Sequence, residues 1–241
     1  MKRDSQLLPP DTETVWEFLK TQPTLAGFVL IGGSALALRI RHRRSEDLDL
    51  VWLETHLPRR RLEALLRIAS ESGLVFEPSD DEAALHDFAD GGLDFHDYQQ
   101  NFLVNRSVKV FFFAPETQLI KVLSAPAEQT VRIATLAELF RAKCLVSAKR
   151  SKTRDWLDLY LLMRDHGFTI RDFAQAFREA GAETQCDTAF ARLCSGLPQR
   201  DDEGYAHLLQ NAPSLQEMTS FFVEQRNRLE IETAAEAKRR R

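Results

Sequence analysis

The sequence predicts an α/β fold, in which a mixed sheet flanked by helices is followed by a helical bundle. Between residues 28 and 113, short apolar runs rich in β-branched and aromatic residues alternate with helical patterns. After about Thr135, apolar residues recur at three- and four-residue spacing, which is typical of helices. We therefore expect an α/β domain over residues 1–134 and a helical domain over residues 135–241.

Length and composition are those of an ordinary soluble globular protein. The 241 residues are 44% hydrophobic and 28% charged, which is enough to bury a sizeable core. No apolar run approaches the roughly 18 residues that span a bilayer, and no apolar segment follows the basic N-terminal residues. The three cysteines lie far apart, as in reduced intracellular proteins. We expect a cytoplasmic protein that does not use a membrane.

The individual elements follow from local patterns. The expected strands are residues 28–31 (FVLI), 47–53 (DLDLVWL), 93–104 and 108–113. The expected helices are the apolar run after Ser34 and residues 58–73, 134–150, 153–167, 170–181 and 213–236. The last two strands are joined at Asn105-Arg106, which we expect to form a hairpin turn.

A glycine turn between the first strand and the first helix of this sheet is a candidate phosphate site. The strand runs into Gly32-Gly33-Ser34, and the helix begins at once. Two glycines let the backbone turn sharply and bring bare N–H groups close to a ligand, while the helix N-terminus adds positive potential. The alternative is an ordinary turn in which Ser34 caps the helix.

Two aspartates begin thirteen residues after Ser34. In a strand, Asp47 and Asp49 point to one face while the intervening leucine points to the other. Paired carboxylates repel each other unless a cation lies between them. Carboxylate oxygens are the ligands that Mg²⁺ takes, usually together with substrate phosphates. The spacing therefore predicts a Mg²⁺ site, and the alternative is a pair of solvent-facing aspartates on an edge strand.

Together, the Gly-Gly/Ser turn, the short helix and the Asp-x-Asp strand resemble the signature of the polymerase-β-like nucleotidyltransferase superfamily. More narrowly, GGSALAL followed by HRRSEDLDL is similar to the AbiEii/AbiGii-type toxin family. A second stretch, FRAKCLVSAKRSKTRDWLDLYLLM at residues 140–163, resembles the helical motif of that family. The two matches frame residues 28–163, and the C-terminal third carries no motif that we can place.

The resemblance implies a nucleotidyltransferase-type fold whose helical half completes the active-site cleft. Its implied catalytic residues are Asp47, Asp49, Lys143 and Asp158, with Mg²⁺ on Asp47 and Asp49, and its implied nucleotide-binding residues are Gly32, Gly33, Ser34, Ser45, Arg154 and Asp155. Asp155 and Asp158 are three residues apart, so they share one face of the predicted helix. The alternative for these two is a surface stripe of ion pairs.

The resemblance also implies substrates and partners. A toxin of a toxin–antitoxin or phage-defence system would move a nucleotide from a nucleoside triphosphate to a hydroxyl acceptor, such as the 3′ end of a tRNA. A cognate antitoxin is the implied protein partner. Basic clusters at residues 39–44, 59–61 and 149–154 fit an RNA acceptor, although a net charge of −4 argues against a general nucleic-acid coat. Solvated charged faces are the alternative for each cluster, and protein acceptors stay open.

One strand departs from the superfamily pattern. Many nucleotidyltransferases carry a third carboxylate on a later strand as general base, whereas residues 107–113, SVKVFFF, contain no acid. The base is therefore unassigned, with Asp155 and Asp158 as candidates, unless positioning and metal charge supply most of the catalysis. The alternative functions are a non-catalytic nucleotidyltransferase fold that binds a nucleotide or a partner, and an interaction module whose glycine turn is only structural.

Overall fold

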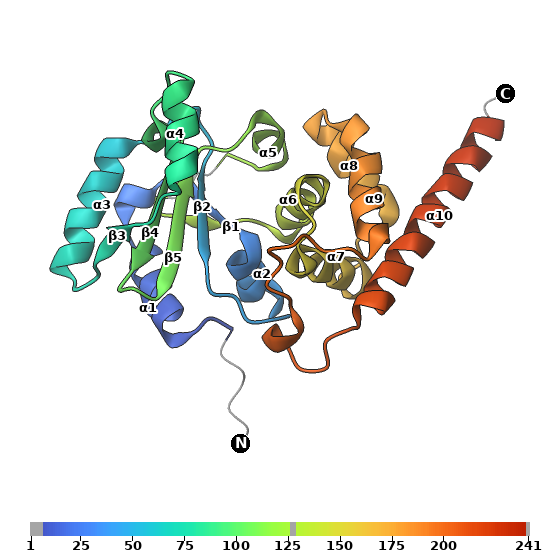
Figure 1. Ribbon diagram of the computed structural model, residues 1–241, viewed down its shortest axis with the longest axis horizontal. Coiled ribbons are helices and arrows are strands. Elements are labelled where there is room, and N and C mark those ends of the chain that lie inside the picture. Colours follow the sequence, from blue (N-terminus) through green and yellow to red (C-terminus); the bar gives the residue numbers. More distant parts are fainter. Residues whose placement is uncertain (1–6, 126–128, 240–241) are drawn as a thin grey trace. The chain divides into compact units, whose positions relative to one another are not determined.

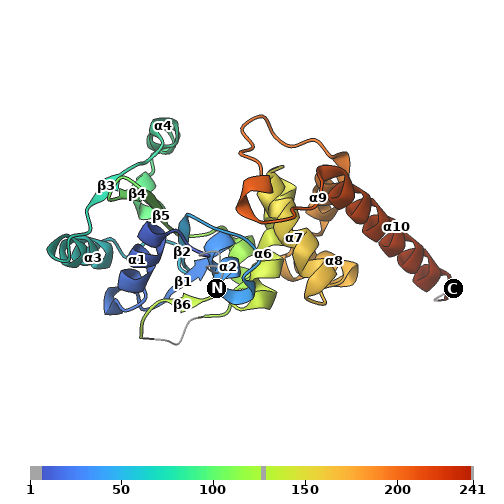
Figure 2. The same ribbon diagram turned by 90° about the horizontal axis from the view of Figure 1, so that it is seen from below.

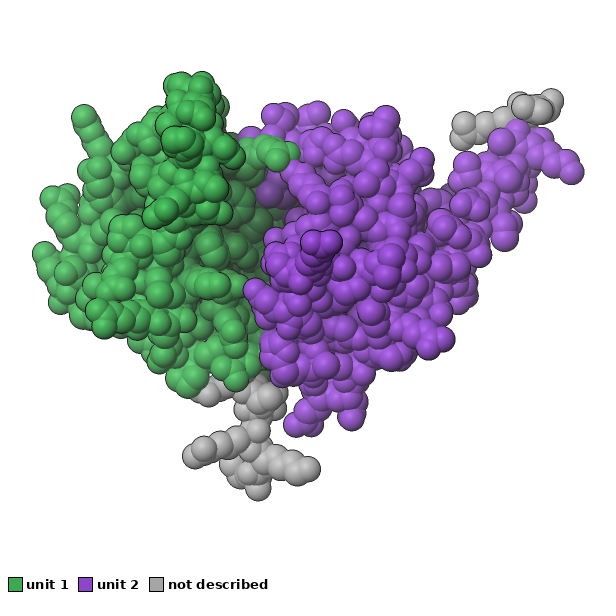
Figure 3. Space-filling model, viewed as in Figure 1, with its two compact units in different colours: residues 1–116, 123–139 green, residues 117–122, 140–241 purple. Residues whose placement is uncertain are grey.

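A computed structural model of the chain describes residues 7–125 and 129–239. The chain forms two compact units, which Figure 3 shows in different colours. Unit 1 comprises Met1–Glu116 and Leu123–Leu139, and unit 2 comprises Thr117–Val122 and Phe140–Arg241. The chain therefore passes from one unit to the other more than once. A boundary between independent domains at residues 134 and 135 stays a prediction.

Unit 1 is built on a mixed six-stranded sheet with the order β3-β4-β5-β2-β1-β6 (Figures 1 and 2). Its strands are β1 (Phe28–Ile31), β2 (Leu48–Trp52), β3 (Phe76–Pro78), β4 (Gln99–Val104), β5 (Val108–Phe113) and β6 (Arg132–Ile133). Strand β2 is antiparallel to β1 and parallel to β5, while β6 is parallel to β1. The mixed sheet and its helices confirm the α/β fold predicted from the sequence.

The helices of unit 1 are α1 (Pro10–Leu19), α2 (Gly32–Ile40), α3 (Arg59–Glu71) and α4 (Glu82–Asp90). Helix α2 packs on β1 and β2, and α1 contacts β5. Leu48 and Leu50 of β2 lie in register with Val110 and Phe112 of β5, and all four side chains are fully buried. Because side chains alternate along a strand, the residue between the two leucines points to the opposite face of the sheet.

The hairpin between β4 and β5 turns at Asn105 and Arg106, as predicted. Their φ angles are +47° and +57°, the left-handed values that a type I′ turn requires at both central positions. The prediction that residues 93–104 are extended throughout is wrong in its first part, because Phe95–Asp97 form a 3-10 turn. Asp94 caps that turn by accepting a hydrogen bond from the His96 amide (2.9 Å).

Helices make up the regular structure in the described part of unit 2. They are α5 (Thr117–Val122), α6 (Leu136–Lys149, which starts in unit 1), α7 (Thr153–Asp165), α8 (Ile170–Ala180), α9 (Cys186–Ser195) and α10 (Leu215–Arg239). Trp156, Phe173 and Phe222 are at most 1% exposed and form the core, where α10 packs on α7, α8 and α9. This bundle confirms the helical second half. Among the described helices, none combines the length and the apolar character needed to cross a membrane.

Candidate active site

The turn between β1 and α2 holds two adjacent glycines. Gly32 has a φ of +75°, a left-handed value that favours glycine. A Cβ added at Gly32 would overlap the Oδ2 atom of Asp49, whose backbone lies in register with Ile31. Glycine is therefore needed here both for the backbone conformation and for the close approach of the Asp49 carboxylate.

Ser34 connects the glycine turn to the aspartate segment. Its side chain is fully buried, and its hydroxyl donates a short hydrogen bond to the carbonyl oxygen of Asp47. Because the hydroxyl proton is directed at the backbone of Asp47, Ser34 holds the start of β2 beside the turn. Contact between Ser34 and a phosphate stays a prediction.

Burial along the aspartate segment alternates as the sequence predicts. Asp47 and Asp49 are half-buried, whereas Leu48 and Leu50 are fully buried in the core. The hydroxyl of Thr12 in α1 donates to the Glu46 carbonyl oxygen (3.1 Å) and fixes the backbone just before the first aspartate. The two carboxylates are thus accessible groups on a firmly held backbone.

Arg43 and Ser45 lie against the second glycine of the turn. A Cβ added at Gly33 would be 2.7 Å from Arg43 Nη2 and 2.7 Å from Ser45 Oγ. Both residues are buried, at 6% and 7% exposure. The Ser45 amide donates to the Leu7 carbonyl oxygen (3.0 Å), and Arg43 Nη1 donates to the Arg44 carbonyl oxygen (3.0 Å).

Ser45 was a predicted site residue, but Arg43 was not. In the sequence, Arg43 is one of several neighbouring arginines, and such clusters are usually solvated. The sequence did contain a signal for Arg43, namely a two-residue alternation. Arg43 and Ser45 extend the alternation of Asp47 and Asp49 towards the N-terminus. The residues between them, Arg44 and Glu46, are exposed.

Three predicted residues of unit 2 meet in one buried cluster. Lys143 Nζ of α6 contacts Asp155 Oδ1 at 2.6 Å and Asp158 Oδ2 at 2.7 Å. The side chains are 8%, 2% and 0% exposed, respectively, so the alternative of a surface ion-pair stripe is wrong. Arg150 adds a second cation, with Nε 2.7 Å from Asp155 Oδ2.

The cluster affects which group can act as general base. Burial raises the pKa of the Asp155 carboxyl, but the charges of Lys143 and Arg150 outweigh burial and hold the pKa below its usual value. A carboxylate with a lowered pKa is a weak proton acceptor. Asp155 is therefore a poor candidate for the base, and Asp158 shares the same lysine.

Arg154 points to a different part of unit 2 from Lys143. Its guanidinium bonds the Gly204 carbonyl oxygen (3.2 Å) and the Glu203 carboxylate (2.8 Å) in the loop after α9. In the same loop, Asp202 accepts hydrogen bonds from the amide (2.9 Å) and the hydroxyl (2.6 Å) of Thr153. This loop therefore caps α7, and nucleotide binding by Arg154 stays a prediction.

Both sequence motifs fall within one family match. The model of the family described as "Nucleotidyl transferase AbiEii toxin, Type IV TA system" matches residues 17–237. The chain belongs to this AbiEii family. It is therefore a member of a family of nucleotidyltransferase toxins, as the motifs predicted.

Three solved structures match this AbiEii-family chain over much of its length. The structure of JHP933 from Helicobacter pylori matches with a TM-score of 0.48 and 15% identity, covering 96% of this chain and 97% of that chain. A second H. pylori structure matches with a TM-score of 0.48 and 17% identity, covering 91% and 95%. The Megavirus polyadenylate synthase matches with a TM-score of 0.42 and 12% identity, covering 64% and 30%. No curated protein matches.

One of the basic clusters of this AbiEii-family chain is largely engaged within unit 1. Arg61 donates to the Thr24 carbonyl oxygen (2.7 Å) and lies over the Trp52 ring, 5.1 Å from its centroid. Arg59 bonds the carboxylates of Asp94 (2.6 Å) and Asp97 (3.1 Å). Both arginines thus hold the fold of unit 1, which weakens the interpretation of residues 59–61 as an RNA contact.

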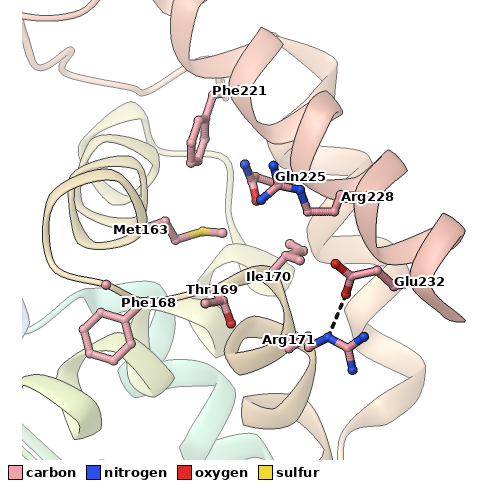
Figure 4. A pocket seen from close by; sticks show the side chains of 10 residues that line it. Met163, Phe168, Thr169, Ile170, Arg171, Phe221, Gln225, Arg228 and Glu232 are labelled. Atoms are coloured by element: carbon pink, nitrogen blue, oxygen red, sulfur yellow. Dashed lines mark hydrogen bonds and ion pairs between the residues drawn. The ribbon is translucent and has the colours of Figure 1, made fainter.

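Unit 2 also contains an open pocket of about 340 Å³ between the end of α7, the start of α8 and α10 (Figure 4). Met163, Phe168 and Phe221 form its apolar side. Its Arg171 bonds Glu232 at 2.7 Å and Glu236 at 2.8 Å, so acidic residues of α10 already neutralise this cation. None of the predicted site residues of this AbiEii-family chain lines the pocket.

Proposed function

We propose that this protein is a Mg²⁺-dependent nucleotidyltransferase that moves a nucleotide from a nucleoside triphosphate to a hydroxyl acceptor and releases pyrophosphate. The observation that carries the proposal is the approach of the Asp49 carboxylate to Gly32 at the opening of α2. It joins an acidic metal ligand and a phosphate-binding turn in one place. Membership of the AbiEii family supports the same reaction class.

The donor set fits a divalent metal ion. Mg²⁺ usually binds through one or two carboxylates and completes its shell with water and substrate phosphates. Asp47, just before β2, and Asp49, within β2, are two half-buried carboxylates, and no group of three His, Cys, Asp or Glu residues forms a cage within the described ranges. We propose that Asp47 and Asp49 hold Mg²⁺, whose charge would offset the negative charge that develops on the leaving group.

The residues of the chain position the nucleotide and balance the charge of its phosphates. The backbone N–H groups at the start of α2 bind phosphate oxygens, and Ser34 keeps Asp47 beside them through its carbonyl oxygen. Lys143 stabilises the carboxylates of Asp155 and Asp158 within unit 2. We propose that these three residues, together with Arg154, also contribute to nucleotide binding.

For the acceptor we propose a hydroxyl of an RNA, with the 3′ end of tRNA as first candidate. The toxin family to which the chain belongs supports a target whose modification stops growth. Arg41, Arg60 and Lys149 keep exposed cationic side chains, as a polyanionic acceptor requires. A cognate antitoxin, a role in phage defence and a cytoplasmic location belong to the same proposal.

The test is transfer of label from each of the four nucleoside triphosphates, labelled at the α-phosphate, to total tRNA in the presence of Mg²⁺. We expect transfer by the wild-type protein and a loss of at least about a hundredfold in Asp49→Asn. Asp90→Asn, at an exposed position at the end of α4, removes the same charge and should keep full activity. Label in protein instead of RNA would identify a protein acceptor.

A non-catalytic binding protein is the second candidate, and one observation favours it. Phe111 of β5 lies in register with Asp49, so an apolar ring stands where the neighbouring strand could offer an acid. This candidate predicts Mg²⁺-dependent nucleotide binding without transfer to RNA or protein. Binding measured by calorimetry together with the absence of transfer would therefore replace the first candidate by the second.

A further inference from the structure

Two buried side chains, those of Arg43 and Ser45, lie against Gly33 in the glycine turn between β1 and α2. Arg43 brings a positive charge to this turn that the sequence of the turn itself does not reveal. Arg43 Nη2 and Ser45 Oγ would each be 2.7 Å from a Cβ added at Gly33. Ser34, by contrast, donates its hydroxyl proton to the Asp47 carbonyl oxygen. Apart from the chain neighbours of Gly33, the polar side-chain atoms nearest to that Cβ position belong to Arg43 and Ser45.

Charges of opposite sign thus meet the turn at consecutive residues. The Asp49 carboxylate lies against Gly32, and the Arg43 guanidinium lies against Gly33. Consecutive Cα atoms are about 3.8 Å apart, so the two charged groups lie beside adjacent residues of one turn. A ligand on this turn would place a metal-bound phosphate at one glycine and a further phosphate beside the arginine.

The chemistry of Arg43 suits this role. A guanidinium stays charged in proteins and presents planar donors that match phosphate oxygens, whereas a lysine ammonium acts as a point charge. Burial at 6% exposure strengthens an electrostatic interaction by reducing solvent screening. The bond from Nη1 to the Arg44 carbonyl oxygen (3.0 Å) holds the group in orientation before a ligand binds.

We propose that Arg43, assisted by the Ser45 hydroxyl, binds the phosphate chain beyond the α-phosphate and makes the site selective for triphosphates. This inference rests on the proposed function, since it concerns the same nucleotide. It adds a specificity-determining residue for the triphosphate that the proposed reaction uses. A nucleoside monophosphate would bind without contacting Arg43.

The test is a series of binding measurements by isothermal calorimetry with the full-length protein. Adenosine and guanosine mono-, di- and triphosphates are titrated in the presence of Ca²⁺, which is chosen to suppress turnover. Inorganic tripolyphosphate is titrated as a probe without a base. The variants are Arg43→Gln, Arg43→Lys and Ser45→Ala, and the control is Arg44→Gln, which removes an exposed neighbouring charge paired with Glu46 at 3.6 Å.

We expect Arg43→Gln to weaken triphosphate and tripolyphosphate binding by roughly tenfold to a hundredfold, the usual range for a hydrogen bond between charged groups. Its monophosphate affinity should stay within about twofold of wild type. Arg43→Lys should recover part of the loss because it keeps the charge. Arg44→Gln should leave the ratio of triphosphate to monophosphate affinity unchanged.

Three results would overturn the inference. Equal weakening of mono- and triphosphate binding in both Arg43→Gln and Arg43→Lys would show that Arg43 only maintains the fold of the turn. An unchanged affinity ratio in Arg43→Gln would show that it does not contact the phosphates, while metal-dependent binding by the wild type would leave the proposed function intact. If the wild type binds no nucleoside triphosphate with any divalent metal, the proposed function falls as well.

Discussion

At the scale of single residues, Gly32 has little freedom to change. Its φ of +75° disfavours any side chain, and its space is occupied by Asp49 Oδ2. Gly73 has a comparable φ of +81° but nothing within 4 Å of the position of a Cβ. Comparing alanine substitutions at Gly32 and Gly73 therefore separates the cost of backbone strain from the cost of a collision with the Asp49 carboxylate.

We predict that Gly32→Ala abolishes measurable transfer, because the added methyl group displaces the Asp49 carboxylate. Its free energy of unfolding should fall by more than that of Gly73→Ala, for which left-handed strain alone costs about 1–3 kcal/mol. Urea unfolding and the transfer assay would check both statements. Equal destabilisation by the two variants, with activity kept in Gly32→Ala, would contradict the close approach.

Lys143 offers a second residue-scale prediction, because it bridges two carboxylates that are 2% and 0% exposed. Removing one partner of a buried ion pair typically costs about 3–5 kcal/mol, so Lys143→Met should strongly lower the free energy of unfolding. Lys152→Met is the control, since Lys152 pairs with an Asp201 that is 73% exposed, at 3.8 Å. It should cost less than about 1 kcal/mol.

A combined variant distinguishes the two roles of Lys143. Lys143→Met with Asp155→Asn and Asp158→Asn removes the buried charges together, so most of the lost stability should return. If the cluster also binds the nucleotide, this triple variant should be stable but should not transfer label to the acceptor. Recovery of activity along with stability would limit the cluster to a structural role.

The candidate site shows what local sequence patterns reveal. Asp47 and Asp49 were predicted to share a face because the strand period of two is a local property, and burial follows it. The direction of the Ser34 hydroxyl and the position of Arg43 over Gly33 were not predicted. Both depend on how a segment folds back across the start of α2, which no local spacing encodes.

At the scale of elements, the start of α6 depends on one carboxylate. Thr135 and Glu138 form reciprocal side-chain to amide bonds, of 2.7 and 3.3 Å, in the manner of a capping box. Glu138 also binds Arg132 at 2.9 Å and the Ser124 amide at 2.5 Å. Burial raises the pKa of the Glu138 carboxyl, but these hydrogen bonds outweigh burial and lower the pKa to about 2, from 4.5.

We therefore predict an acid-dependent loss of stability that Glu138→Gln removes. The folded state lowers the pKa, so the stabilising contribution is complete above pH 4.5 and disappears as the pH falls towards 2. It amounts to about 3 kcal/mol near neutral pH. Urea unfolding of wild type and Glu138→Gln should differ by this order at neutral pH and converge in acid, whereas exposed Glu71→Gln should follow wild type throughout.

Helices with a strong local signal were predicted, whereas α1, α4 and α9 and the short elements β3, β6 and α5 were not. Helices α3, α6, α7 and α8 have long apolar stripes or clear end signals, so their residues indicate them without tertiary information. Strand β6 has two residues and α5 has six. Such short segments form because β1 or α8 lies beside them, and a neighbour distant in the chain leaves no periodic signal.

At the scale of the whole molecule, nucleotide-binding residues were predicted in each of the two units. The family match likewise spans residues 17–237 and therefore both units. We predict that a nucleoside triphosphate with Mg²⁺ slows amide hydrogen exchange, severalfold or more, in peptides covering residues 28–50 and also in peptides covering 140–163. Asp49→Asn should abolish both effects at the same nucleotide concentration.

Protection confined to residues 28–50 would be the contrary result. It would mean that the cluster of Lys143, Asp155 and Asp158 stabilises unit 2 without taking part in nucleotide binding. The site would then consist of the glycine turn, Asp47 and Asp49, together with Arg43 if the inference above holds.

The path of the chain between the two units also affects the order in which the units can be completed during synthesis. Helix α5 belongs to unit 2 and contacts α8, with Lys121 Nζ 3.4 Å from the Ala180 carbonyl oxygen. On the ribosome, α5 emerges before Leu123–Leu139, which completes unit 1, and long before α8. During synthesis, the last segment of unit 1 is therefore available to fold while α5 of unit 2 still lacks its partner α8. A ribosome stalled before Ile170 would hold α5 unpaired and available to chaperones.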